Sequence, residues 1–148
     1  MSDRYRIAVV VSRFNRAVTD RLLEGARKAA AERGALCGPE DVFAVPGAFE
    51  LPVVASRLAE LPRYQGVVCL GAVIRGQTPH FEYISRETAA GIQQVALRTG
   101  KPLSFGVLTT DTVEQALARA GGEVGNKGFD AVVAVLETLA VLERVSAC

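Results

Sequence analysis

The sequence predicts an α/β fold in which a mainly four-stranded parallel sheet is covered by helices on both faces. Two observations lead to this prediction. The expected strands are short, continuously apolar runs rich in β-branched residues, as in strands that are buried on both faces. Each run is followed by a segment with apolar residues at helical spacing. Such alternation favours parallel strands joined by right-handed crossovers.

The first half of the chain contains two strand-helix units. Residues 5–12, YRIAVVVS, form the first β-branched run, and a helical segment follows over residues 16–34. Its apolar residues recur at helical spacing: Val18, Leu22, Ala26 and Ala29 or Ala30. A second, shorter strand is expected over residues 42–45. A Pro-Gly pair then indicates a turn, and a helix is expected to follow as far as Leu61.

Two further units and a last helix complete the pattern. A strand is expected over residues 67–73 and a helix over residues 79–98, followed by a strand over residues 103–110. Asp111, with Glu114 three residues later, predicts a capped helix start. The apolar stripe of this short helix is expected to consist of Val113, Ala116, Leu117 and Ala120.

The end of the chain is a break followed by an apolar helix. The stretch GGEVGNKG indicates a loop. A helix is then expected over residues 129–144, with apolar residues both on and off its main stripe, so we expect burial on more than one face. No linker, repeat or low-complexity segment interrupts the chain, and we expect residues 1–148 to form one domain.

These elements together predict a flavodoxin-like three-layer α/β/α sandwich. In such folds ligands bind beyond the carboxyl ends of the strands, where loops and helix N-termini converge. Four segments of this chain lie at that edge, at residues 12–15, 46–50, 71–80 and 105–110. We therefore expect the functional residues in these segments and in the helices beside them.

Composition argues against several classes of protein. The apolar residues, 49% of 148, come in runs too short for a membrane span, and residues 1–6 are too polar for a secretory signal, so a cytoplasmic protein is expected. Cys37, Cys69 and Cys148 are scattered and odd in number, which indicates reduced thiols with neither disulfides nor zinc. A net charge of +1 without a basic cluster argues against a nucleic-acid partner. Small molecules or further copies of the chain are the expected partners.

The only histidine, His80, follows a glycine-bearing loop at an expected helix start. Thr78, Pro79 and His80 fit the N-cap and the first two positions of a helix, which explains the threonine and the proline without a ligand. A helix N-terminus with Gly76 beside it also suits a phosphate, although the loop lacks the Walker A sequence. The positive end of the helix favours a neutral imidazole that can exchange protons. His80 is thus either a catalyst or a helix-start residue.

Other candidates also have two interpretations. Phe14 could stack on a planar heterocycle or could be a core or lid residue, and Phe105 is equally ambiguous. Glu50 could accept hydrogen bonds from ligand hydroxyls, or it could simply favour a helix start. Arg119 could bind a phosphate bidentately or be an exposed arginine. Lys127 lies in a turn sequence that needs no ligand.

Five stretches, in this order and at these intervals, resemble the 6,7-dimethyl-8-ribityllumazine synthase family: SRFN, VPGAFELP, GAVIRGQTPHFEYI, FGVLTTDTVEQALARAG and GNKG. The resemblance extends over about residues 6–142, and the stretch around His80 is its most specific part. It implies condensation of 5-amino-6-(D-ribitylamino)uracil with 3,4-dihydroxy-2-butanone 4-phosphate, with release of phosphate and water. This is the penultimate step of riboflavin synthesis, and the family uses no metal or organic cofactor.

The resemblance also implies roles for individual residues. Phe14 is similar to the ring that stacks on the pyrimidine, and His80 to the proposed proton donor. Six residues match the segments that hold the ribitylaminouracil: Ala48, Phe49, Glu50, Ala72, Val73 and Ile74. Gln77 and Thr78 match the phosphate-binding helix start.

Three further residues match positions that the family places at or near its shared active sites. Arg119 is similar to a phosphate-binding arginine, Phe105 to an aromatic residue contributed across a subunit interface, and Lys127 to a lysine near the site. The family forms homopentamers, some of which assemble into 60-subunit shells. We expect a pentamer as the basic unit, with decamer and 60-mer as alternatives. Many members of the family lay an extra N-terminal strand on a neighbour's sheet, and the few residues before Phe14 argue against such a strand and so against the full shell.

The required chemistry consists of repeated proton transfers and needs no protein nucleophile, so holding two substrates together is expected to provide much of the acceleration. Three other functions fit parts of the sequence. A lumazine or flavin carrier would use the same crevice without turnover. A structural shell protein would have no use for His80 or Arg119. A flavodoxin-type electron carrier would need a Ser/Thr-rich phosphate loop after the first strand, which this sequence lacks.

Overall fold

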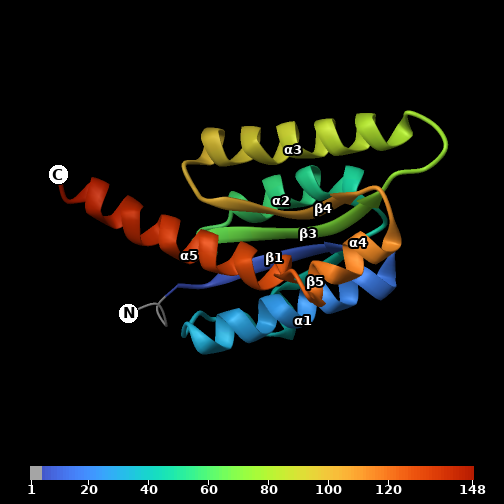
Figure 1. The fold of residues 1–148 in the computed structure, drawn as a ribbon. Coiled ribbons are helices and arrows are strands. Elements are labelled where there is room, and N and C mark those ends of the chain that lie inside the picture. Colours follow the sequence, from blue (N-terminus) through green and yellow to red (C-terminus); the bar gives the residue numbers. More distant parts are fainter. Residues whose placement is uncertain (1–4) are drawn as a thin grey trace.

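The computed structural model describes residues 5–148 as a four-stranded, all-parallel sheet between two layers of helices (Figure 1). The strands are β1 (Ile7–Ser12), β2 (Val42–Val45), β3 (Gly66–Ile74) and β4 (Leu103–Thr110), in the order β2-β1-β3-β4. The helices are α1 (Arg16–Glu32), α2 (Leu51–Ala59), α3 (His80–Thr99), α4 (Val113–Ala118) and α5 (Lys127–Ser146). The predicted flavodoxin-like sandwich is confirmed.

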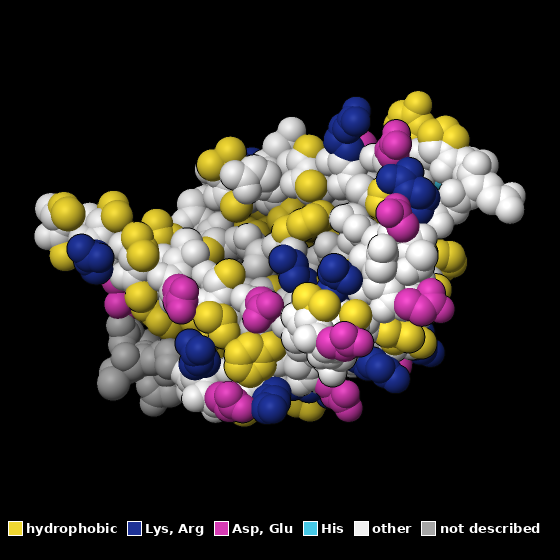
Figure 2. Space-filling view, viewed as in Figure 1, with side chains coloured by type: hydrophobic (Ala, Val, Ile, Leu, Met, Phe, Trp, Pro, Cys, Tyr) yellow, Lys and Arg dark blue, Asp and Glu magenta, His cyan; other side chains and the backbone are white. Residues whose placement is uncertain are grey.

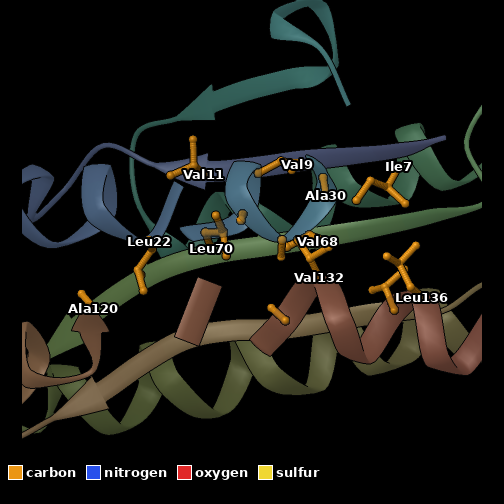
Figure 3. Close-up of a cluster of buried hydrophobic side chains, with 14 of the residues drawn as sticks. Ile7, Val9, Val11, Leu22, Ala30, Val68, Leu70, Ala120, Val132 and Leu136 are labelled. Atoms are coloured by element: carbon orange, nitrogen blue, oxygen red, sulfur yellow. The ribbon is translucent and has the colours of Figure 1, made fainter. Parts of the chain in front are cut away.

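The two central strands, β1 and β3, are buried on both faces because their alternate side chains pack against different helix layers. On β1, Ile7, Val9 and Val11 face a cluster formed with α1 and α5, whereas Ala8 and Val10 face a cluster formed with α2 and α3. Figure 3 shows the first cluster, in which side chains from β1 and β3 meet those of α1 and α5. This double burial explains why the strand sequences are continuously apolar.

The element boundaries differ from the sequence-based expectations in several places. The first strand begins at Ile7, because Arg6 pairs with Leu36 only as an isolated bridge. The 3-10 turns Pro39–Asp41 and Ala48–Glu50 precede β2 and α2, and α2 ends at Ala59. Residues 1–4, on which the expectation about secretion partly rests, lie outside the described range.

The start of α4 is also corrected. Its N-cap is Thr112 rather than Asp111, because the Thr112 hydroxyl accepts a hydrogen bond from the Gln115 N–H at 3.1 Å. The short helix stops at Ala118, so Ala120 is buried as part of a strand rather than on a helical stripe. Asp111 instead forms an ion pair with Arg75.

The expected break after α4 contains regular structure. Two short strands, β5 (Ala120–Gly122) and β6 (Gly125–Asn126), pair antiparallel. The last helix then begins at Lys127, earlier than expected, because the Asn126 side chain accepts hydrogen bonds from two N–H groups of its first turn. Its buried residues form a single stripe: Gly128, Ala131, Val132, Val135, Leu136 and Leu139. The expectation of burial on more than one face is wrong, and Val141 is 52% exposed.

A buried carboxylate holds together the sheet edge opposite the expected site. Asp41 has no exposed surface, and its oxygens accept hydrogen bonds from the Tyr64 hydroxyl at 2.7 Å, the Gly38 N–H at 2.9 Å and the Arg6 guanidinium. Burial and this hydrogen bond raise the pKa of Tyr64 to about 12. The network joins the start of β1 to the segments before β2 and β3.

The three cysteines are unpaired. Burial raises the pKa of Cys69, in the middle of β3, to about 12, so its thiol is protonated and packs as a small apolar group. In the described part of the chain, none of the helices combines the length and the apolarity that crossing a bilayer requires.

Candidate active site

Loops from three strands meet at the carboxyl edge of the sheet and enclose a crevice of about 550 Å³. We call it the strand-end crevice. It is lined by Phe14 and Asn15 after β1, by residues 46–50 after β2, by the end of β3, and by the start of α3. Because the four strands of the main sheet are parallel, these segments reach the same edge even though they are distant in sequence.

The loop after β1 holds the Phe14 ring at the mouth of this crevice. The Arg13 and Phe14 N–H groups donate to the carbonyls of Val45 and Pro46, at 2.8 and 3.1 Å. Asn15 is left-handed, with φ 65°, a conformation that asparagine tolerates better than most residues, and its amide donates to the Ala72 carbonyl at 2.9 Å. The Phe14 side chain is 71% exposed, so its ring face is available for stacking.

The turn after β2 forms a second wall. The Gly47 N–H donates to the Glu50 carboxylate at 2.9 Å, and the Thr88 hydroxyl on α3 donates to the Ala48 carbonyl at 3.3 Å. One oxygen of Glu50 therefore stabilises the turn. Both interpretations of this residue are compatible with the geometry, because a carboxylate has further lone pairs for a ligand hydroxyl.

The loop from β3 to α3 carries the candidate phosphate-binding residues. The Pro79 carbonyl accepts the first helical hydrogen bond, from the Glu82 N–H at 3.0 Å, so Pro79 is the N-cap and His80 the first helical residue. The expected assignment, with Thr78 as N-cap, is wrong by one position. The Thr78 hydroxyl nevertheless accepts a bond from the His80 N–H at 3.4 Å. His80 is exposed and lines the crevice.

The crevice combines an apolar floor with polar groups at one end. Ala48, Ala72, Val73 and Ile74 supply the floor, and Phe14 stands at its mouth. Thr78 and His80 lie where the chain turns into α3, beside the N–H groups of a helix start. A flat, partly apolar ring and an anionic group can therefore be held together here.

Three predicted residues lie elsewhere, in a hollow of about 420 Å³ beside β4. This β4 hollow is lined by Phe105, Val107, Leu108, Thr109, Thr110, Arg119, Val124, Lys127 and Asp130. Arg119 is the C-cap of α4, and one of its guanidinium nitrogens donates to the Gln115 carbonyl at 3.0 Å. Lys127 begins α5. Two cationic side chains and an aromatic ring thus share a face that does not line the strand-end crevice.

Phe105 also lines a larger groove of about 700 Å³ between α3 and α5. Figure 2 shows this hollow, with hydrophobic side chains on its floor. Its base is β4, which is an edge strand of the four-stranded sheet. Uncovered edge strands favour association with other chains. Leu97 on α3, another residue that lines the groove, is 74% exposed.

The sequence-predicted site residues therefore fall into two groups. The strand-end crevice is lined by nine of them: Phe14, Ala48, Phe49, Glu50, Ala72, Val73, Ile74, Thr78 and His80. The β4 hollow is lined by Phe105, Arg119 and Lys127. Gln77 lines neither of these two hollows, although its neighbours Gly76 and Thr78 line the crevice.

Sequence reasoning missed two residues that the structure places among the candidates. Asn15 lines the crevice and ties its first loop to β3. Asp130 lines the β4 hollow one helical turn after Lys127. The spacing of three residues on a helix could have indicated that Lys127 and Asp130 share a face.

Comparison with known proteins gives a consistent result. The model of the family described as 6,7-dimethyl-8-ribityllumazine synthase matches residues 4–143. A protein of that name from Syntrophus aciditrophicus (strain SB) is 51% identical over 140 residues, covering 95% of this chain and 91% of the relative. Another of that name, from Sulfurospirillum multivorans, is 51% identical over 136 residues, covering 92% of this chain and 87% of the relative.

Proposed function

Because the chain belongs to the 6,7-dimethyl-8-ribityllumazine synthase family, we propose that it makes 6,7-dimethyl-8-ribityllumazine, the penultimate step of riboflavin synthesis. The substrates are 5-amino-6-(D-ribitylamino)uracil and 3,4-dihydroxy-2-butanone 4-phosphate, and the other products are phosphate and water. The observation that carries the proposal is the convergence of Phe14, Thr78 and His80 on one crevice. These residues suit a flat ring, a phosphate and a proton transfer.

The arrangement supports a specific placement of the two substrates. The pyrimidine stacks on Phe14 over the apolar floor, and the ribityl hydroxyls reach the free lone pairs of Glu50. The phosphate lies at the loop before α3. A Cβ added at Gly76 would meet no atom within 4 Å, so the backbone there is open to an anion. Both reacting groups are then held in contact, which removes much of the entropic barrier.

The reaction proceeds without a protein nucleophile. The primary amine attacks the ketone carbon, and the resulting carbinolamine loses water to form an imine. Phosphate then leaves, the enol becomes a carbonyl, and the ribityl-bearing nitrogen attacks it to close the ring with loss of a second water. His80, exposed at the crevice wall, is positioned to exchange the protons of these steps.

The second group of residues is supplied by a neighbouring copy of the chain. Phe105, Arg119 and Lys127 line the β4 hollow rather than the crevice of their own chain. In this proposal a neighbour turns that hollow toward the crevice and completes the site, with Arg119 on the phosphate and Phe105 on the ring. The uncovered β4 edge and the exposed Leu97 support contacts between copies. The basic unit is a homopentamer.

The location proposed is the cytoplasm, since three unpaired thiols suit a reducing compartment.

The decisive test mixes the purified protein with both substrates and follows lumazine fluorescence and phosphate release together. We expect both products to appear at equal rates. His80→Ala should slow turnover roughly a hundredfold while leaving it measurable. Arg119→Ala should lower kcat/KM for the phosphorylated ketone roughly ten- to a hundredfold.

Arg98→Ala serves as the matched control, since Arg98 is exposed, pairs with Glu60, and lies in the last turn of α3, at the opposite end of the helix from His80. Its activity should equal that of the parent. Tight lumazine binding without product formation would replace the proposal with a carrier function. Complete loss of activity in a folded, assembled His80→Ala protein would contradict a mechanism based on substrate positioning.

A further inference from the structure

Arg75 is the first residue after β3 and so begins the loop that leads to His80. The family resemblance assigns no role to Arg75, and Arg75 does not line the strand-end crevice. Its N–H donates to the Thr110 carbonyl at 2.8 Å, which extends the pairing of β3 with β4 by one residue. The start of the loop is thereby fixed to the end of the neighbouring strand.

The guanidinium of Arg75 contacts three side chains at once. Its Nε donates to the Asp111 carboxylate at 2.7 Å, and its Nη1 lies 3.6 Å from the Glu82 carboxylate. Its central carbon lies 4.5 Å from the centre of the Phe81 ring. A planar fork can make such contacts simultaneously, whereas the ammonium of a lysine cannot.

These partners lie on both sides of the loop. Asp111 follows β4, whereas Phe81 and Glu82 belong to the first turn of α3. Phe81 also lines the strand-end crevice. The guanidinium therefore connects the end of the sheet with the start of the helix and spans the loop of residues 76–79 from outside.

The loop has little other support within residues 5–148. Gly76 and Gln77 make no hydrogen bond with the rest of the described chain. Beyond them, the Thr78 hydroxyl makes only a long bond, at 3.4 Å, to the His80 N–H. The position of the loop thus depends on its two ends, and Arg75 joins one end to the other.

We propose that Arg75 is a positioning residue that clamps the loop of residues 76–79 in the shape that receives the phosphate of the four-carbon substrate. This inference rests on the proposed function. Arg75 does not line the crevice, so it acts through the loop rather than on the substrate. Its clamp affects the phosphate end of the site, while the pyrimidine end depends on the loops after β1 and β2.

The test compares the KM values of the two substrates. Arg75→Lys retains the charge but loses the fork and the ring contact. We expect it to raise the KM for the phosphorylated ketone about fivefold, the upper range for an exposed ion pair, and to leave the KM for the ribitylaminouracil unchanged. The inhibition constant of inorganic phosphate should rise by the same factor. Asp111→Asn should shift both phosphate-dependent constants in the same direction by a smaller factor.

Arg98→Lys is the matched control, because Arg98 is 51% exposed and ion-paired as Arg75 is 46% exposed and ion-paired. It should leave every constant unchanged. Thermal melting and sedimentation confirm that each variant folds and assembles as the parent does. An equal increase in the KM values of both substrates would overturn the clamp. So would an unchanged KM for the phosphorylated ketone in both Arg75→Lys and Asp111→Asn.

The two proposals fail in distinguishable ways. If the parent protein turns over and is inhibited by phosphate but the variants behave identically to it, only the clamp is wrong. If the parent protein neither forms lumazine nor binds phosphate, the proposed function is wrong and the clamp falls with it.

Discussion

His80 and Arg119 line separate hollows of the same chain: His80 the strand-end crevice and Arg119 the β4 hollow. If each site is built from the crevice of one chain and the β4 hollow of its neighbour, two defective variants should complement each other. We expect chains carrying both Phe14→Ala and His80→Ala, co-assembled with equal amounts of Arg119→Ala chains, to regain about a quarter of the parent activity. In random assemblies, about a quarter of the interfaces place the intact crevice of an Arg119→Ala chain beside the intact β4 hollow of a doubly substituted chain. The measurement is lumazine formation before and after mixing under dissociating conditions.

Each variant assembled alone provides the control for this experiment. Unchanged activity after mixing, in assemblies shown to contain both chains, would mean that the site lies within one chain. A monomer in sedimentation at the assay concentration would contradict the shared site directly.

Replacement of Phe14 should separate binding from stability. The ring is 71% exposed, so Phe14→Ala removes little buried surface and should leave the melting temperature unchanged. Loss of a stacking partner should raise the KM for the ribitylaminouracil about tenfold, and Phe14→Tyr should restore it. Val53→Ala, another exposed apolar position at 63%, is the control and should not change the KM. An unchanged KM in Phe14→Ala would exclude stacking on this ring.

Removal of one hydroxyl should weaken the buried network at the opposite edge of the sheet. Tyr64→Phe leaves the Asp41 carboxylate without its 2.7 Å hydrogen bond and should cost about 1.5 kcal/mol of unfolding free energy, roughly 5 °C in melting temperature. Tyr83→Phe, at an exposed tyrosine, should have no such effect. Equal melting temperatures for all three proteins would show that the hydrogen bond contributes nothing net.

The same network predicts a dependence of stability on acid. Burial alone would raise the pKa of Asp41, but hydrogen bonds from Gly38, Arg6 and Tyr64 outweigh it and lower that pKa below its ordinary value of 3.8. The unfolded chain therefore takes up this proton at a higher pH than the folded chain. The stabilisation is complete above pH 3.8 and is lost as the pH falls through the folded pKa.

Melting temperatures measured from about pH 6 down to about pH 3 test this expectation. Asp41→Asn should melt at a lower temperature than the parent at about pH 6. Its melting temperature should fall less steeply with acid, because the asparagine has no carboxylate that takes up a proton on unfolding. Parallel curves for the two proteins would contradict the assignment of acid sensitivity to Asp41.

Close packing of α1 against α5 should make Gly128 intolerant of substitution. A Cβ at this position would lie 2.0 Å from the Leu22 carbonyl oxygen, so the two helices would have to move apart. Gly128→Ala should destabilise the protein by about 3 kcal/mol. Gly76→Ala, where a Cβ would meet nothing within 4 Å, should leave stability unchanged. Denaturant unfolding of both variants measures the difference, and comparable stabilities would refute the packing argument.

Prediction from the sequence succeeded where local pattern and burial agree. Apolar runs such as residues 67–73 can be satisfied only by strands covered on both faces, so the parallel sheet and the alternation of helices followed directly. It failed at the ends of elements. Asp111 and Thr112 are both good helix caps, but in the fold Thr112 caps α4 and Asp111 pairs with Arg75, which is 36 positions away in sequence.

Sequence alone thus determined the fold class, the family and the residues that gather at the strand ends, because each of these depends on residue type and spacing along the chain. Only the tertiary structure decided that the candidate residues divide between two hollows, that Asn15 and Arg75 brace the crevice loops, and that α5 buries a single stripe. These features depend on contacts between segments distant along the chain. Such contacts arise only when the parallel strands bring their ends to one edge and leave β4 uncovered.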